Sequence, residues 1–119
     1  MAILLQEDDA QVFAGAMDAA SVLRMSAASL IEAFAVVNRK GFEAHLERLI
    51  DEVAIRVEPV TARQARIAGG ALRQFGRGTG HPARLNFGDS FPYALSVDLG
   101  EPLLFKGQDF AQTDVRSAL

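Results

Sequence analysis

Three carboxylates, those of Glu32, Asp89 and Asp109, have sequence surroundings in which they could serve as metal ligands. Glu32 is the only charged residue between positions 27 and 37, and its helical neighbours are small or apolar. Asp89 follows Gly88 at the start of an apolar stretch, and Asp109 lies four residues after Phe105, where another apolar run ends. A carboxylate is costly to bury unless it is paired or binds a cation, so these residues are candidate metal ligands.

Each candidate also has a purely structural interpretation. Glu32 would then lie on the solvent-exposed edge of its helix. An aspartate such as Asp89, before a helix with Pro92 in its first turn, is typical of an N-cap, worth about 1 kcal/mol. Asp109 and the later Asp114 have the composition of turn or cap residues. The residues alone leave both interpretations open.

The chemistry open to such a set is narrow. The chain has no cysteine and only two histidines, His45 and His81, which are too few for a histidine-based zinc site. Ligation by oxygen alone suits Mg²⁺ or Mn²⁺. Such an ion lowers the pKa of a bound water and neutralises charge that builds on a phosphodiester. The glycine-rich residues 76–82 lack the Gly-Lys-Ser/Thr ending of a nucleotide-binding loop.

The formal net charge is −3, yet positive charge is concentrated in one segment. Residues 59–88 contain no acidic side chain but carry Arg63, Arg66, Arg73, Arg77 and Arg84. This local excess could contact phosphates. The alternative is an ordinary solvated helix face followed by a loop.

The elements that must position these residues alternate between helices and short strands. Apolar spacing predicts helices over residues 8–22, 27–38, 42–53, 61–75 and 89–99, and strands over residues 23–25, 54–60 and 102–105. Residues 2–5 are predicted to be the last turns of a helix. The 119 residues fit one α/β domain with a mostly parallel sheet. No apolar run reaches the roughly 18 residues of a membrane span, and no basic leader opens the chain, so a cytoplasmic location is expected.

The C-terminal third resembles PIN-domain proteins of the VapC toxin type. The resemblance rests on LNFGDSFPYAL at residues 85–95, EPLLFKGQDF at residues 101–110 and TDV at residues 113–115. Residues 26–32 are similar to the second acidic element of the family. The resemblance implies a PIN-like three-layer α/β/α fold with a short, mostly parallel central sheet, as a single domain over residues 1–119.

It also implies a function, with residues assigned by position. The chain would be a Mg²⁺- or Mn²⁺-dependent endoribonuclease, the toxin of a VapBC-type toxin–antitoxin pair. Glu32, Asp89 and Asp109 would be the metal-binding and catalytic residues, and Asp114 an outer-shell residue. The implied partners are RNA, a VapB-type antitoxin and a second copy of the chain. The arginines expected to contact RNA are Arg73, Arg77 and Arg84.

The sequence departs from the family pattern at its start. Family members open with a strand that ends in Asp, followed by Ser or Thr and Ala, whereas residues 1–7 match the end of the first helix. We therefore expect an N-terminally truncated domain without its first strand and that Asp, with weakened ion binding and impaired activity. One alternative is a catalytically degenerate PIN domain that binds antitoxin or RNA. Another is an unrelated α/β domain in which the acids never converge.

Overall fold

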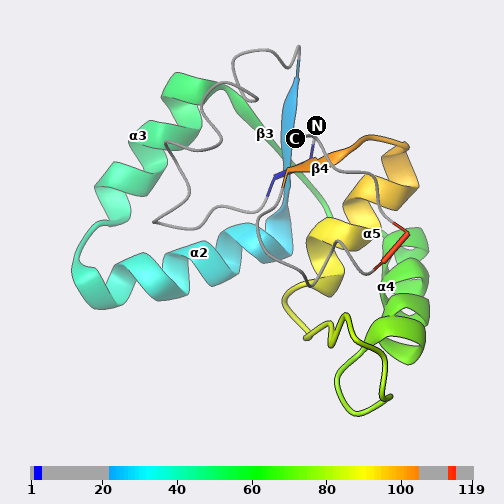
Figure 1. Ribbon diagram of the computed structural model, residues 1–119. Helices are drawn as coiled ribbons and strands as arrows, with labels where there is room; N and C mark the ends of the chain where they lie inside the picture. The colour runs from blue at the N-terminus through cyan, green and yellow to red at the C-terminus, as the bar shows by residue number, and fades with distance from the viewer. Residues whose placement is uncertain (1, 4–21, 105–112, 115–119) are drawn as a thin grey trace.

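The central sheet has four parallel strands in the order β3-β2-β1-β4 (Figure 1). The structure is a computed structural model that describes residues 2–3, 22–104 and 113–114. The strands are β1 (Ala2–Ile3), β2 (Leu23–Ser26), β3 (Ile55–Glu58) and β4 (Leu103–Leu104). The strands predicted at residues 23–25, 54–60 and 102–105 are thus confirmed, with bounds that differ by at most two residues at either end.

Strand β1 corrects the prediction for the start of the chain. The sequence pattern predicts the end of a helix at residues 2–5, whereas Ala2–Ile3 pairs with both β2 and β4. Without a segment between them, the facing edges of β2 and β4 would present unpaired backbone donors and acceptors. That requirement comes from the assembled sheet and leaves no periodic signal in so short a segment. The start of the chain, where we expected no strand, therefore forms a strand two residues long.

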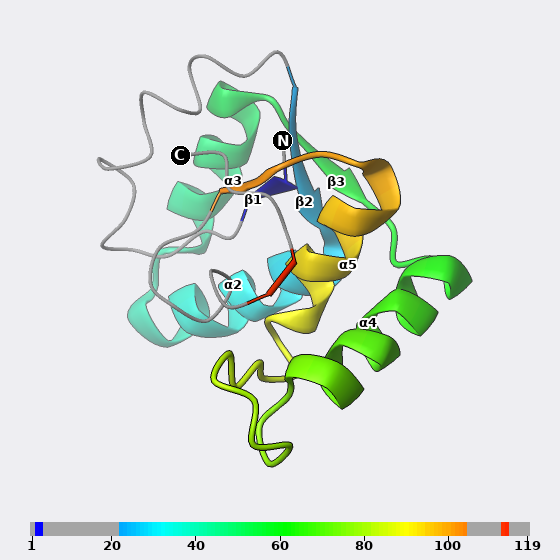
Figure 2. The ribbon, with the colours of Figure 1, turned by 45° about the vertical axis from the view of Figure 1, so that its right-hand side comes forward.

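Helices cover both faces of the sheet, which gives the expected three layers. In Figures 1 and 2, α2 and α3 lie on one side of the strands, and α4 and α5 lie on the other. The bounds are α2 (Ala27–Lys40), α3 (Glu43–Val53), α4 (Ala62–Phe75) and α5 (Ser90–Leu99). These agree with the predicted helices to within two residues. The helix predicted over residues 8–22 lies outside the described residues, apart from Val22. No helix in the described part of the chain is long and apolar enough to cross a membrane.

Two side-chain caps fix where the helices nearest the site begin. Ser26 Oγ accepts a hydrogen bond from the Ala28 amide over 3.3 Å at the start of α2. Thr61 Oγ1 accepts one from the Gln64 amide over 3.1 Å at the start of α4. Each cap satisfies an amide that has no partner within its helix, and is worth about 1 kcal/mol. Because Ser26 is also the last residue of β2, its cap ties the start of α2 to the carboxyl end of a strand.

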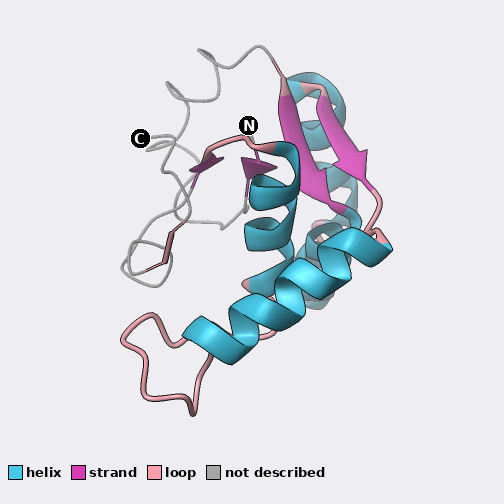
Figure 3. Cartoon of the chain, turned by 90° about the vertical axis from the view of Figure 1, so that its right-hand side faces the viewer, coloured by secondary structure: helices cyan, strands magenta, loops and turns pink. Residues whose placement is uncertain are grey.

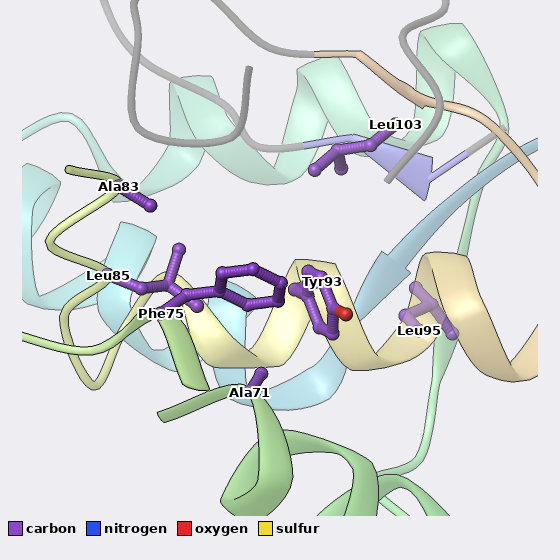
Figure 4. Close-up of a cluster of buried hydrophobic side chains, with 7 residues drawn as sticks. All are labelled: Ala71, Phe75, Ala83, Leu85, Tyr93, Leu95 and Leu103. Atoms are coloured by element: carbon purple, nitrogen blue, oxygen red, sulfur yellow. The ribbon is translucent and has the colours of Figure 1, made fainter. Parts of the chain in front are cut away.

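The apolar core is divided between the two faces. One cluster joins β2 and β3 to α3 and consists of Leu23, Met25, Leu46, Ile50 and Ile55. The other joins α4 and α5 to β4, and Figure 4 shows its members: Ala71, Phe75, Ala83, Leu85, Tyr93, Leu95 and Leu103. The rings of Phe75 and Tyr93 lie 6.0 Å apart between centroids. This second cluster holds α5, and therefore Asp89 at its start, against the rest of the domain.

The loop between α4 and α5 projects from the molecule but is closed at its base (Figure 3). The Leu85 amide donates to the Phe75 carbonyl over 2.8 Å, and the Arg77 amide donates to the Leu85 carbonyl over 3.1 Å. Gly76 is required at this closure, because a Cβ there would lie 2.1 Å from the backbone oxygen of Leu72. The loop is therefore anchored where α4 ends and again at the buried Leu85.

Candidate active site

Glu32 extends from the middle of α2 toward the start of α5. The residue as a whole is exposed. Partial burial of its carboxyl group, and then the negative charge of Asp89, raise the pKa of Glu32 above its ordinary value. A like charge has this effect only at short range, so the two carboxylates are electrostatic neighbours. The structure thus brings together Glu32 and Asp89, which are far apart in the sequence.

Glu32 of α2 lies against Gly88, which precedes α5. A Cβ built on Gly88 would lie 2.3 Å from Glu32 Oε2, 2.8 Å from Oε1 and 2.9 Å from Cδ. These separations are far shorter than the contact distance between nonbonded atoms. The carboxyl group of Glu32 therefore occupies the space that a side chain at position 88 would fill.

Asp89 precedes α5, but its side chain does not act as the predicted N-cap. Its backbone is already helical, with φ −66° and ψ −26°, and it makes no side-chain cap hydrogen bond. The Asn86 amide donates to Asp89 Oδ2 over 3.0 Å, and the Asp89 amide donates to Asn86 Oδ1 over 2.8 Å. This reciprocal pair is a capping box in which Asn86 is the capping residue. The Asn-x-x-Asp spacing at residues 86–89 was the sequence signal for it.

The other two predicted acidic residues have different outcomes. Asp109 lies outside the described residues. Asp114 is described, and its Oδ1 accepts a hydrogen bond from the Tyr93 hydroxyl over 2.5 Å. Tyr93 stands one helical turn after Asp89 on α5, and its amide donates to the Asp89 carbonyl over 3.3 Å. Among the residues that the structure describes, no three acidic or histidine side chains are grouped closely enough to hold a metal ion together.

The arginines between residues 59 and 88 differ in what they already bind. Arg63 is engaged, because its Nε lies 2.6 Å from Asp98 Oδ1. Arg73, Arg77 and Arg84 are exposed at the end of α4 and in the following loop. Within the described part of the chain none of these three is paired with a carboxylate. Arg77 Nε instead donates to the Arg84 carbonyl over 3.3 Å, which ties the two loop arginines together.

An apolar groove of about 270 Å³ runs along α4 and α5, and its lining includes Phe87 and Ser90, which flank Gly88 and Asp89 in the sequence. Phe87, which directly precedes Gly88, lines it and is 71% exposed. Its ring meets that of Phe91 edge to face, with centroids 4.9 Å apart. The sequence pattern did not single out Phe87, because an aromatic residue in an apolar run is indistinguishable from a core residue until the fold is known. The site therefore combines paired acids with adjacent apolar surface.

The comparison with known families matches the geometry. The model of the PIN domain matches residues 1–116. The chain belongs to the VapC-type PIN-domain family. It is 51% identical over 122 residues to Ribonuclease VapC28 of Mycobacterium tuberculosis and to VapC ribonuclease Mb0625 of Mycobacterium bovis. Each of these alignments covers 100% of this chain and 92% of the relative.

A second set of relatives carries the same family name. Ribonuclease VapC42 of Mycobacterium tuberculosis is 46% identical over 121 residues, which cover 99% of this chain and 92% of the relative. In this chain Asp89 directly precedes α5, and Glu32 is the sixth residue of α2, which follows β2.

Proposed function

We propose that this VapC-type PIN domain is a metal-dependent endoribonuclease and the toxin of a VapBC-type toxin–antitoxin pair. The observation that carries the proposal is the contact of the Glu32 carboxyl group with Gly88, next to Asp89. Two acids from separate elements are thereby held in one place. The substrate class is supported by relatives that are named ribonucleases.

The residues present fit Mg²⁺ or Mn²⁺ in their donor chemistry. Carboxylate oxygens are the ligands that these ions prefer. Partial burial, and then the negative charge of Asp89, raise the pKa of Glu32, and a bound cation would offset both effects. Asp109 is proposed as a third ligand on the strength of the family resemblance. When bound, the ion would supply a water of lowered pKa and offset charge on the phosphodiester.

The chain's own residues have distinct tasks in this proposal. Glu32 and Asp89 hold the ion, and the Asn86 amide fixes one oxygen of Asp89. Asp114 is an outer-shell residue, and the hydroxyl group of Tyr93, one turn along α5, donates a hydrogen bond to it. Arg73, Arg77 and Arg84 attract the phosphate backbone of RNA, whereas Arg63 is engaged by Asp98.

Hydrolysis by this chain is proposed to be slow. The residues that follow β1 in the sequence are Leu4, Leu5 and Gln6, so no carboxylate comes directly after this central strand. Without a carboxylate at this point, the site would have one acidic ligand fewer and would bind an ion more weakly. The same observation favours the second candidate function, a catalytically degenerate PIN domain that binds RNA or antitoxin without cutting.

The proposed protein partners are a VapB-type antitoxin and a second copy of the chain, in the cytoplasm. Ile31 and Phe87 are 70% and 71% exposed, and they directly precede Glu32 and Gly88 in the sequence. A partner that covered these two side chains would remove apolar surface from water, which favours association. An antitoxin segment that covered them would also block the carboxylates.

Cleavage of a single-stranded RNA with Mn²⁺ tests the proposal. We expect metal-dependent cleavage that Glu32→Gln and Asp89→Asn each reduce by at least about 100-fold. Glu47→Gln is the matched control, because Glu47 is an exposed acid on α3. Mn²⁺ should also raise the unfolding temperature of the wild type, since an ion at 100 times its Kd stabilises by about 2.7 kcal/mol. Absence of Mn²⁺-dependent stabilisation in both the wild type and Glu32→Gln would favour the degenerate binding module. Absence of cleavage as well would contradict the endoribonuclease function.

A further inference from the structure

Gly88 is a glycine for a reason other than backbone conformation. Its φ lies outside the left-handed region, which the chain uses at Gly41, Gly78, Gly80 and Gly100. An alanine at position 88 would therefore meet no backbone strain. What excludes a side chain there is the Glu32 carboxyl group, whose three terminal atoms would all lie within 2.9 Å of a Cβ.

The nature of the obstructing atoms distinguishes Gly88 from Gly76. At Gly76 the obstacle is the backbone oxygen of Leu72, which belongs to α4 and cannot withdraw without disrupting the helix. At Gly88 the obstacle is the carboxyl end of the Glu32 side chain, which is long, partly solvated and able to adopt other rotamers. A methyl group at 88 would thus leave the fold intact and move Glu32.

We propose that Gly88 is a positioning residue for Glu32, whose missing side chain leaves the space in which the Glu32 carboxyl group lies beside Asp89. This inference rests on the proposed function only in so far as Glu32 and Asp89 hold an ion. With a methyl group at 88, the carboxyl group must withdraw by about 1 Å to reach ordinary contact distance. Displacements of that size at supporting positions of metal sites typically cost about 10–100-fold in affinity.

The test compares Mn²⁺ affinity, measured by calorimetry, for four proteins. These are the wild type, Gly88→Ala, Glu32→Gln and the double variant. We expect Gly88→Ala to weaken Mn²⁺ binding by about 10–100-fold. We expect the double variant to bind no more weakly than Glu32→Gln alone, because a residue that acts through Glu32 has nothing to position once that ligand is lost.

Thermal unfolding without metal separates positioning from a structural role. Gly88→Ala should melt at or slightly above the wild-type temperature, since replacing a glycine at a permissive φ restricts the unfolded chain. Gly69→Ala on α4 is the control, because a Cβ there meets no atom within 4 Å, and it should leave Mn²⁺ affinity unchanged. Wild-type affinity in Gly88→Ala, or a further loss in the double variant, would overturn the inference.

A crystal structure of metal-free Gly88→Ala gives a readout that does not depend on the proposed function. The inference requires the backbone at position 88 to stay in place and the Glu32 carboxyl group to be displaced. An undisplaced carboxyl group with a shifted backbone would refute it. If the wild type bound no Mn²⁺, the proposed function would fail while this structure still decided the role of Gly88.

Discussion

The hydroxyl group of Tyr93 donates a hydrogen bond to Asp114 Oδ1 over 2.5 Å, which connects α5 to a residue 21 positions later in the sequence. Tyr93 is 5% exposed and belongs to the apolar cluster between α4, α5 and β4. Burial, then the hydrogen bond and charge of Asp114, raise the pKa of Tyr93. This relationship gives a spectroscopic measure of where the C-terminal segment lies.

Because Tyr93 is the one tyrosine of the chain and there is no tryptophan, tyrosinate absorbance reports on this hydroxyl alone. We expect the wild type to titrate well above the ordinary value of about 10. Asp114→Asn should lower the midpoint while leaving it above that value, since burial remains. A raised pKa stabilises the fold below the unfolded pKa and is lost as the pH rises through the folded pKa, so unfolding should accompany alkaline titration. Equal midpoints in the two proteins would show that Asp114 does not bind Tyr93.

The pKa of Glu32 is raised as well, but this carboxyl group is ionised at neutral pH, so its effect on stability is expected at pH 7. Its raised pKa means that it favours the fold below its unfolded pKa of about 4.3 and that this contribution is lost as the pH rises through the folded pKa. At neutral pH the ionised carboxylate therefore opposes folding of the metal-free protein. Glu32→Gln should raise the unfolding temperature slightly at pH 7, the rise being small because solvent screens an exposed group, and the gain should vanish below about pH 4.

Saturating Mn²⁺ should reverse that order, since the ion binds more tightly to the protein that retains the Glu32 carboxylate and stabilises it more. Thermal unfolding by circular dichroism at both pH values, with a chelator and with Mn²⁺, measures the whole pattern. The interpretation would be wrong if Glu32→Gln lowered the metal-free unfolding temperature at pH 7.

The arginines at the end of α4 should control the salt dependence of RNA binding. Removing one phosphate contact lowers the slope of log K against log salt by about 0.7 for a single strand. We expect this change for Arg73→Ala and Arg77→Ala, and a smaller one for Arg63→Ala, because Arg63 is paired with Asp98. Fluorescence anisotropy with a catalytically blocked protein, such as Asp89→Asn, measures the slopes.

Arg84 offers a variant in which lost binding cannot be attributed to unfolding. Its φ is +49°, in the left-handed region, which costs a non-glycine residue roughly 1–2 kcal/mol. Arg84→Gly should therefore raise stability by up to about 1 kcal/mol while weakening RNA binding. A variant that is less stable, or that binds RNA as tightly as the wild type, would contradict this prediction.

The contact between α4 and α5 depends on Asp98 more than on its exposed partner. Asp98 Oδ2 accepts from Nε2 of Gln64, which is 4% exposed, while Arg63 is 76% exposed. Asp98→Ala leaves the buried amide without this acceptor and should cost about 1–3 kcal/mol. Arg63→Ala should cost at most about 1 kcal/mol, as exposed ion pairs do. Urea unfolding compares the two, and equal losses would be inconsistent with the burial argument.

The sequence was sufficient for what depends on local periodicity. The helices predicted over residues 27–38 and 61–75 follow from apolar spacing, and the structure confirms them. It was insufficient where an interaction joins distant segments. Strand β1 is defined by the two strands beside it, and its two residues are too few to give a periodic signal in the sequence.

The same limit applies to the candidate site. The pairing of Glu32 with Asp89 was expected from the family resemblance, but the role of Gly88 appears only when α2 and α5 are placed together. Asp89 was interpreted as a cap because an aspartate before a helix usually is one. The competing capping residue, Asn86, lay three positions earlier and takes that role.

The closure at the base of the loop between α4 and α5 has a thermodynamic consequence for any ligand that binds at Arg77 and Arg84. The hydrogen bonds between Phe75, Arg77 and Leu85 order both ends of this segment when the protein folds. The backbone of this loop has therefore lost conformational entropy before a ligand binds. Complex formation needs to immobilise chiefly the side chains of Arg77 and Arg84. Affinity at this loop should accordingly have a small entropic penalty, and hydrogen exchange at the amides of Arg77 and Leu85 should already be slow in the free protein.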